Sequence, residues 1–147
     1  MKFYTYLIIL SVLMLTGCSW MKKISKSHTV KHELINPNTF HIKGVAQDAT
    51  YAFSQHNPVK VGGADTNNEI LNERRFLNAL RGPNGERLTY ELTGSCCYYK
   101  TPEGSASPIG MLDRYEVTYG NRKHIIYLTP FEKGELKAPK GFSFVKK

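Results

Sequence analysis

The sequence predicts an α+β domain, in which an antiparallel sheet of four to six strands carries one principal helix packed on a face. Three observations lead to this prediction. One long segment has apolar residues at helical spacing, several shorter segments alternate apolar and polar residues, and turn residues separate them. Because no internal repeat or low-complexity block interrupts residues 30–147, we expect a single globular domain there.

The principal helix is expected over residues 68–80. Its apolar residues are broadly compatible with one face of a helix: Ile70, Leu71, Phe76, Leu77 and Leu80. Polar residues fill most intervening positions, and Gly82-Pro83 follows as a signal that ends a helix. A helix with one apolar face is expected to bury it against the sheet.

Strand patterns surround this helix. Apolar and polar residues alternate over 87–93 and again over 114–119. The turn residues of 120–123 then lead into the apolar segment 124–129, so 115–129 predicts an antiparallel hairpin. A short edge strand is expected at 141–144, and another strand near the start, at 30–35 or 39–45.

The beginning of the chain resembles the signal peptide and lipobox of a bacterial lipoprotein. Lys2 is followed by a mainly apolar stretch and then by Leu15-Thr16-Gly17-Cys18. The resemblance implies that residues 1–17 are removed and that Cys18 receives acyl chains, leaving 18–29 as a lipidated basic tether. The alternative is an uncleaved membrane anchor, because no charge lies between Lys2 and Lys22.

The resemblance also implies a location. Ser19-Trp20 lacks the aspartate that retains such proteins in the inner membrane of enteric bacteria, so we expect the outer membrane, with the domain on its periplasmic face. The net charge is +8, and it falls to +7 without residues 1–17. Export makes nucleic acid an unsuitable partner for this charge. An envelope protein, lipid or glycan fits better, in addition to the membrane that holds Cys18.

Lipidation of Cys18 leaves two neighbouring cysteines, Cys96 and Cys97, in a compartment that oxidises thiols. They can pair with each other, pair between molecules or stay reduced. A bond between neighbours is awkward, because a trans peptide holds their Cα atoms near 3.8 Å while disulfides usually span 4.4–6.8 Å. Such a bond would suit a redox or ligand-responsive module. The alternative places one cysteine in the core and the other in a turn.

A second candidate site binds an anion or another ligand. Gly62-Gly63 would let a ligand approach the backbone, and the helix after them would offer its N-terminal amides. Positive charge would come from Lys60, Arg74 and Arg81. The alternative is that the glycine pair, like the segment 81–85, simply makes a turn.

Catalytic and metal-binding patterns are weak. His28 and His32 have the spacing of a helical chelating pair, but the residues between them favour extended backbone, and no Cys-x-x-Cys occurs. An enzyme would need Arg74, Arg81, a histidine and a cysteine to meet in one cleft. We therefore predict no catalytic residue, metal or cofactor. The expected function is a non-enzymatic, envelope-associated binding module, and the alternative is a thiol-based module at Cys96-Cys97.

Four stretches resemble a group of small bacterial lipoproteins of unknown function. They span residues 57–63, 75–85, 94–97 and 138–142. Some members of that group carry the name of 3-deoxy-octulosonate 8-phosphate synthase, an aldolase. Such an aldolase is a barrel of eight strand–helix units that needs about 250 residues, whereas this chain has 147. The resemblance therefore implies a lipoprotein with one folded domain, and no known activity.

Overall fold

The computed structural model describes residues 30–147. The predicted signal peptide, the predicted lipidation site Cys18, the predicted tether 18–29 and His28 lie outside the described residues. Within them the elements follow in this order: β1 (Leu34–Asn36), β2 (Thr39–Phe40), β3 (Val59–Lys60), the 3-10 helix η1 (Ala64–Thr66), α2 (Glu69–Ala79), β4 (Leu80–Arg81), β5 (Thr89–Lys100), β6 (Ile109–Tyr119), β7 (Arg122–Thr129) and β8 (Ser143–Phe144).

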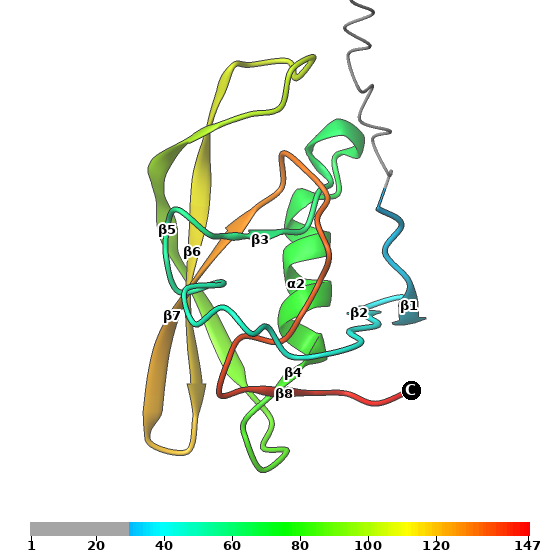
Figure 1. The fold of residues 1–147 in the computed structure, drawn as a ribbon, viewed down its shortest axis with the longest axis vertical. Coiled ribbons are helices and arrows are strands. Elements are labelled where there is room, and N and C mark those ends of the chain that lie inside the picture. Colours follow the sequence, from blue (N-terminus) through cyan, green and yellow to red (C-terminus); the bar gives the residue numbers. More distant parts are fainter. Residues whose placement is uncertain (1–29) are drawn as a thin grey trace, which may run out of the picture.

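The predicted α+β class is confirmed. A four-stranded sheet has the order β3-β7-β6-β5, and α2 packs on one of its faces (Figure 1). The pairs β5-β6 and β6-β7 are antiparallel, whereas the short β3 joins the edge of β7 in parallel. Two small antiparallel pairs, β1-β2 and β4-β8, complete the domain. No helix in residues 30–147 is both long and apolar enough to cross a membrane.

The predicted helix is confirmed within one residue at each end. Its buried apolar face consists of Phe76, Leu77 and Ala79, which pack with Val117, Ile126 and other strand residues in one hydrophobic core. The prediction that Ile70 and Leu71 share this face is wrong, because their side chains are 54% and 37% exposed. At about 100° per residue Leu71 lies nearly opposite the centre of the buried face and Ile70 lies at its edge, so only the second half of the apolar pattern is buried.

The strand predictions vary in accuracy. The hairpin 115–129 is confirmed as the end of β6 and all of β7, joined by a two-residue turn with Gly120 at φ 53°. The strand expected at 87–93 is much longer, since β5 continues to Lys100. Two β-bulges, between Leu92 and Gly94 and between Cys96 and Tyr98, each accommodate one extra residue, so β5 stays paired with β6 along its whole length. Of the edge strand expected at 141–144, only Ser143–Phe144 forms a strand, β8, which pairs with β4 and not with the main sheet.

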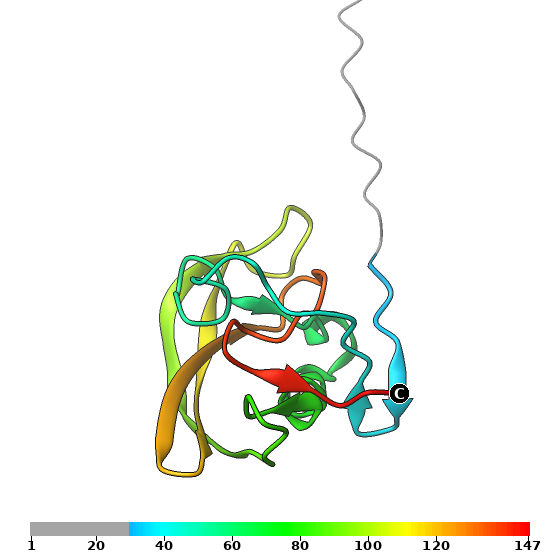
Figure 2. The ribbon, with the colours of Figure 1, turned by 60° about the horizontal axis from the view of Figure 1, so that its bottom comes forward.

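The start of the domain covers α2 from the side opposite the sheet. Figures 1 and 2 show α2 between the four-stranded sheet and the β1-β2 pair. Arg75 Nε donates a hydrogen bond to the Pro37 carbonyl at 2.8 Å, and Asn78 Nδ2 donates to the Asn38 carbonyl at 2.8 Å. These contacts hold the turn between β1 and β2 against the helix. A cavity lies beside them, between α2 and the segment that leads into β1.

Candidate functional site

A cavity of about 550 Å³ lies where the described chain begins. Its walls come from the segment 30–34, β2, the loop before α2, the N-terminal half of α2 and the loop after β7. The lining residues are Val30, Lys31, His32, Leu34, Phe40, Thr66, Asn68, Asn72, Arg75 and Lys133. The volume falls within the range of small-molecule binding sites.

The charged residues of this cavity are all positive. Lys31, Arg75 and Lys133 line it, and no Asp or Glu does so among the described residues. These three cations form no ion pair with any side chain of 30–147, whereas other lysines of the domain do: Lys43 with Glu33, Lys60 with Glu132, Lys123 with Glu116 and Lys137 with Glu135. The cavity therefore concentrates positive charge, although Lys31 also lines an adjoining cavity together with Glu33 and Glu135.

Arg75 is fixed by neutral acceptors. Besides the bond to Pro37, one of its terminal nitrogens donates to Asn72 Oδ1 at 3.0 Å. Asn72 is buried, and its Nδ2 donates to the Gly62 carbonyl at 2.9 Å. Neutral partners orient the guanidinium without cancelling its charge, and three of its five N–H groups have no partner among the described residues.

His32 adds a neutral imidazole to the same cavity. Its Nε2 lies 2.8 Å from the Gly134 carbonyl, so Nε2 carries the hydrogen, and its ring meets Phe40 edge-on at 5.0 Å. Burial lowers its pKa, the Gly134 hydrogen bond partly offsets this, and the charge of Lys133 lowers the pKa further. A negative ligand would counteract the effect of Lys133 and raise the pKa of His32.

The glycine pair predicted as part of a ligand site borders this cavity. Gly62 and Gly63 have φ angles of 63° and 123°, which side chains rarely adopt. A Cβ on Gly62 would meet the Lys133 side chain, and one on Gly63 would lie 2.8 Å from both the Asn68 backbone and Asn72 Nδ2. Both glycines are thus needed for close packing against cavity residues.

Replacement of Gly63 by alanine is expected to destabilise the domain by more than replacement of Gly85. Both positions have positive φ, but the space around Gly85 is open, so Gly85→Ala measures the backbone cost alone. Gly63→Ala adds a clash with the start of α2, for a total of about 2–4 kcal/mol. Urea unfolding of both variants measures this difference; equal losses would show that the contact at Asn68 and Asn72 is unimportant.

The structure does not bring the predicted cations Lys60, Arg74 and Arg81 to this site. Lys60 pairs with Glu132. Arg74 is exposed and lines a separate cavity with Ile70 and Leu71. Arg81 follows the C-terminal end of α2 and donates to the Asn78 carbonyl at 2.9 Å and to the Leu80 carbonyl at 2.6 Å. The predicted anion site is therefore split. Of its five residues, only Gly62 and Gly63 pack against residues of the cavity lined by Lys31, Arg75 and Lys133, which we call the basic cavity.

Sequence reasoning missed the residues that do meet there. Arg75 was expected only as part of the polar side of the helix, and His32 was considered only for a metal pair with His28. Nothing in the sequence marks Lys133, because the loop after β7 reaches the cavity through the tertiary fold. Within residues 30–147, no group of three or more His, Cys, Asp or Glu side chains is placed to hold a metal ion.

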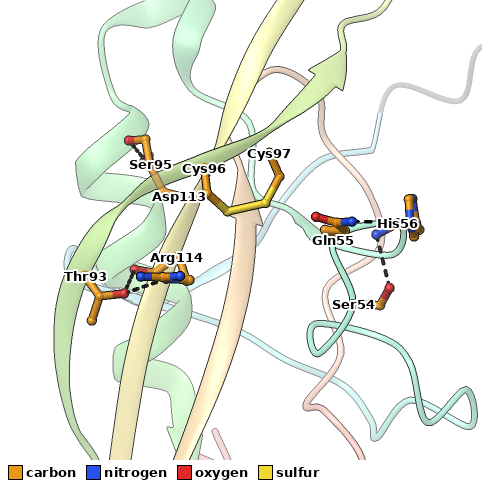
Figure 3. Close-up of a disulfide and its surroundings, with 9 residues drawn as sticks. All are labelled: Ser54, Gln55, His56, Thr93, Ser95, Cys96, Cys97, Asp113 and Arg114. Carbon is orange, nitrogen blue, oxygen red and sulfur yellow. Dashed lines mark hydrogen bonds between the residues drawn. A yellow bond between two sulfur atoms is a disulfide. The ribbon is translucent and has the colours of Figure 1, made fainter.

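Cys96 and Cys97 are joined by a disulfide, with their Cα atoms 3.8 Å apart across a trans peptide (Figure 3). Both side chains are half-buried on β5, so the expectation of one core and one turn cysteine is wrong. Cys97 is the extra residue of a bulge and has φ 59°, a value uncommon outside glycine. Neither cysteine lines the basic cavity.

The strand neighbours of the disulfide are tied to β6. Ser95 Oγ donates to the Asp113 carboxylate, and Arg114 Nε donates to Thr93 Oγ1 at 3.0 Å, as Figure 3 shows. Tyr98, directly after the pair, is 87% exposed. These bonds hold β5 at the first bulge and directly after it, while the half-buried disulfide lies further along this edge strand.

A buried carboxyl group lies between α2 and the sheet. Glu73 is 1% exposed; the Tyr115 hydroxyl donates to its Oε2 at 2.7 Å, while its Oε1 has no partner among the described residues. Burial, followed by hydrogen bonding to Asp113, raises the pKa of Glu73 to about 8. The raised pKa keeps Glu73 protonated at neutral pH, which avoids burying a carboxylate whose Oε1 has no partner among the described residues.

Comparisons with known proteins add no identity to these features. No protein-family model matches the chain, no curated protein matches it, and no solved structure matches its fold.

Proposed function

We propose that this chain is an outer-membrane-anchored periplasmic lipoprotein whose domain is a non-enzymatic binding module. Cys18 carries the lipid anchor, and the cavity beside the first described residues binds an anionic group of an envelope component. The observation that carries the proposal is the meeting of Lys31, Arg75 and Lys133 around one cavity that no carboxylate of the described residues lines.

The geometry supports binding of a compact anion such as a phosphate or carboxylate. Arg75 offers N–H groups in a planar fork, which suits such anions. Lys31 and Lys133 supply further charge. Partial enclosure lowers the effective dielectric constant and strengthens each of these attractions relative to bulk water.

Photo-crosslinking in intact cells tests the proposal. A photoreactive amino acid at Thr66, which lines the cavity, should capture an envelope component, and the same probe at Thr118, which does not, should capture none. Capture at Thr66 should fall at least fivefold when Arg75 and Lys133 are changed to Gln. Failure to capture anything above a Cys18→Ala control would count against the proposal.

The disulfide supports a second candidate function, a thiol-based redox or ligand-responsive module. A dithiol would reduce Cys96–Cys97 to two thiols and become a disulfide itself, so that two electrons and two protons are transferred. Loss of the bond would free Cys97 to leave its left-handed conformation and change the bulge. Alkylation of protein taken directly from the periplasm, followed by mass spectrometry, tests this candidate: two freely alkylated cysteines would eliminate it.

A further inference from the structure

The position of the basic cavity relative to the predicted anchor restricts what can reach it. Val30 and Lys31, the first described residues, line the cavity. They follow Cys18 by only 12 and 13 residues, so even a fully extended tether places the cavity within about 40 Å of a lipidated Cys18. The cavity thus stays beside the membrane that holds the anchor, and a shorter path of the tether brings it to the surface.

The cavity also has two chemical sides. Positive charge comes from Lys31, Arg75 and Lys133, while Val30, Leu34 and Phe40 provide apolar surface. Leu34 is 41% exposed, although Phe40 is buried. A ligand with a negative group next to a less polar part matches both sides, whereas a fully hydrated anion such as free phosphate matches only the first.

We infer that the ligand of this cavity is the phosphate-bearing headgroup of an anionic phospholipid in the same membrane that holds the anchor. This inference rests on the proposed function and names its ligand class. The phosphate lies against the three cations, and the glycerol part lies against Val30, Leu34 and Phe40. Binding would fix the orientation of a domain that the lipid on Cys18 alone leaves free to turn.

The tether makes a weak site sufficient. Ligand and domain share one surface, so binding is effectively intramolecular, and short flexible linkers give effective concentrations in the millimolar range. Lys22, Lys23 and Lys26 add positive charge between Cys18 and the cavity, which favours an anionic leaflet over a neutral one. A cavity that binds the headgroup with millimolar affinity in solution would therefore be substantially occupied at the membrane.

Vesicle sedimentation tests the inference with the mature chain carrying Cys18→Ala. This chain keeps the hydrophobic core of residues 30–147, and acylation would mask weaker binding. Vesicles of phosphatidylglycerol and phosphatidylcholine should bind this protein, and pure phosphatidylcholine should not. Arg75→Gln with Lys133→Gln should weaken binding at least tenfold. Arg74→Gln with Lys137→Gln removes the same charge outside the cavity and should change binding less than twofold. Glycerol 1-phosphate should compete more strongly than inorganic phosphate.

Each other outcome has a defined meaning. Equal losses in the two double variants would overturn the inference, because binding would then follow net charge and not the cavity. If vesicles do not bind but inorganic phosphate still perturbs the cavity residues, the lipid ligand is wrong and the proposed anion site stands. If neither binds, both proposals fail. Stronger competition by inorganic phosphate than by glycerol 1-phosphate would assign the cavity to a soluble anion.

Discussion

Glu73→Gln is expected to make the domain more stable at alkaline pH. This holds although the substitution removes a negative charge from a protein whose net charge is positive. Burial and Asp113 raise the pKa of Glu73 from 4.5 to about 8 in the folded state. In the unfolded chain the same carboxyl group loses its proton near pH 4.5. Between pH 4.5 and about 8 the folded state therefore binds a proton that the unfolded state releases, so the free energy of unfolding falls as the pH rises. The cost grows by about 1.4 kcal/mol per pH unit and levels off above the folded pKa, at on the order of 5 kcal/mol.

The glutamine variant does not have this cost. Its amide can accept the hydrogen bond from the Tyr115 hydroxyl and donate one toward Asp113, as the protonated carboxyl group does. Urea unfolding at pH 5, 7 and 9 should show nearly equal stability of the two proteins at pH 5 and a growing advantage of the variant above it. Glu103→Gln, at an exposed position, is the control and should show no such trend. A wild-type stability that rises from pH 5 to 9 relative to the variant would contradict the assignment.

Cys18→Ala is expected to move the protein from the membrane to the soluble periplasmic fraction. Each buried methylene of an acyl chain contributes about 0.8 kcal/mol, and two or more chains make attachment firm. Without them only the weaker basic and cavity contacts remain. Cell fractionation measures the change, and intact-mass spectrometry should find acyl groups on wild type but not on the variant.

A double Cys96→Ala and Cys97→Ala variant serves as the matched control and should stay in the membrane fraction. If the wild-type protein in the membrane fraction carries residues 1–17 and no acyl group, the first segment is an uncleaved anchor. Residues 18–29 would then not be a lipidated tether, and the limit on the distance between the cavity and a lipidated Cys18 would no longer apply.

The fold could be predicted where local pattern and tertiary structure agree. The helix 68–80 and the hairpin 115–129 combine apolar periodicity with a clear turn or stop signal, and both are present in the structure. β5 was predicted too short, since Gly94 and the cysteine pair resemble a turn and are accommodated by bulges instead. The parallel pairing of β3 with β7 depends on a contact between distant segments, which no local pattern encodes.

The candidate site shows the same division more sharply. Arg74 and Arg75 are neighbours in the sequence, but successive helical residues differ by about 100° in direction. Arg74 is therefore exposed to solvent, whereas Arg75 contacts the Pro37 carbonyl. Lys133 joins the site through a loop nearly 60 residues away along the chain. A set of residues chosen by type and closeness in sequence therefore found two glycines that pack against cavity residues and missed the charged residues that line the cavity.

We propose that the cavity at the start of the domain binds a negative group. NMR titration of the ¹⁵N-labelled mature chain, carrying Cys18→Ala, with inorganic phosphate measures this binding. We expect saturable shifts of the Lys31, His32, Arg75 and Lys133 signals, together with a rise in the pKa of His32. Shifts that do not saturate, or that centre on Arg74 and Arg81 while the cavity signals stay fixed, would contradict it.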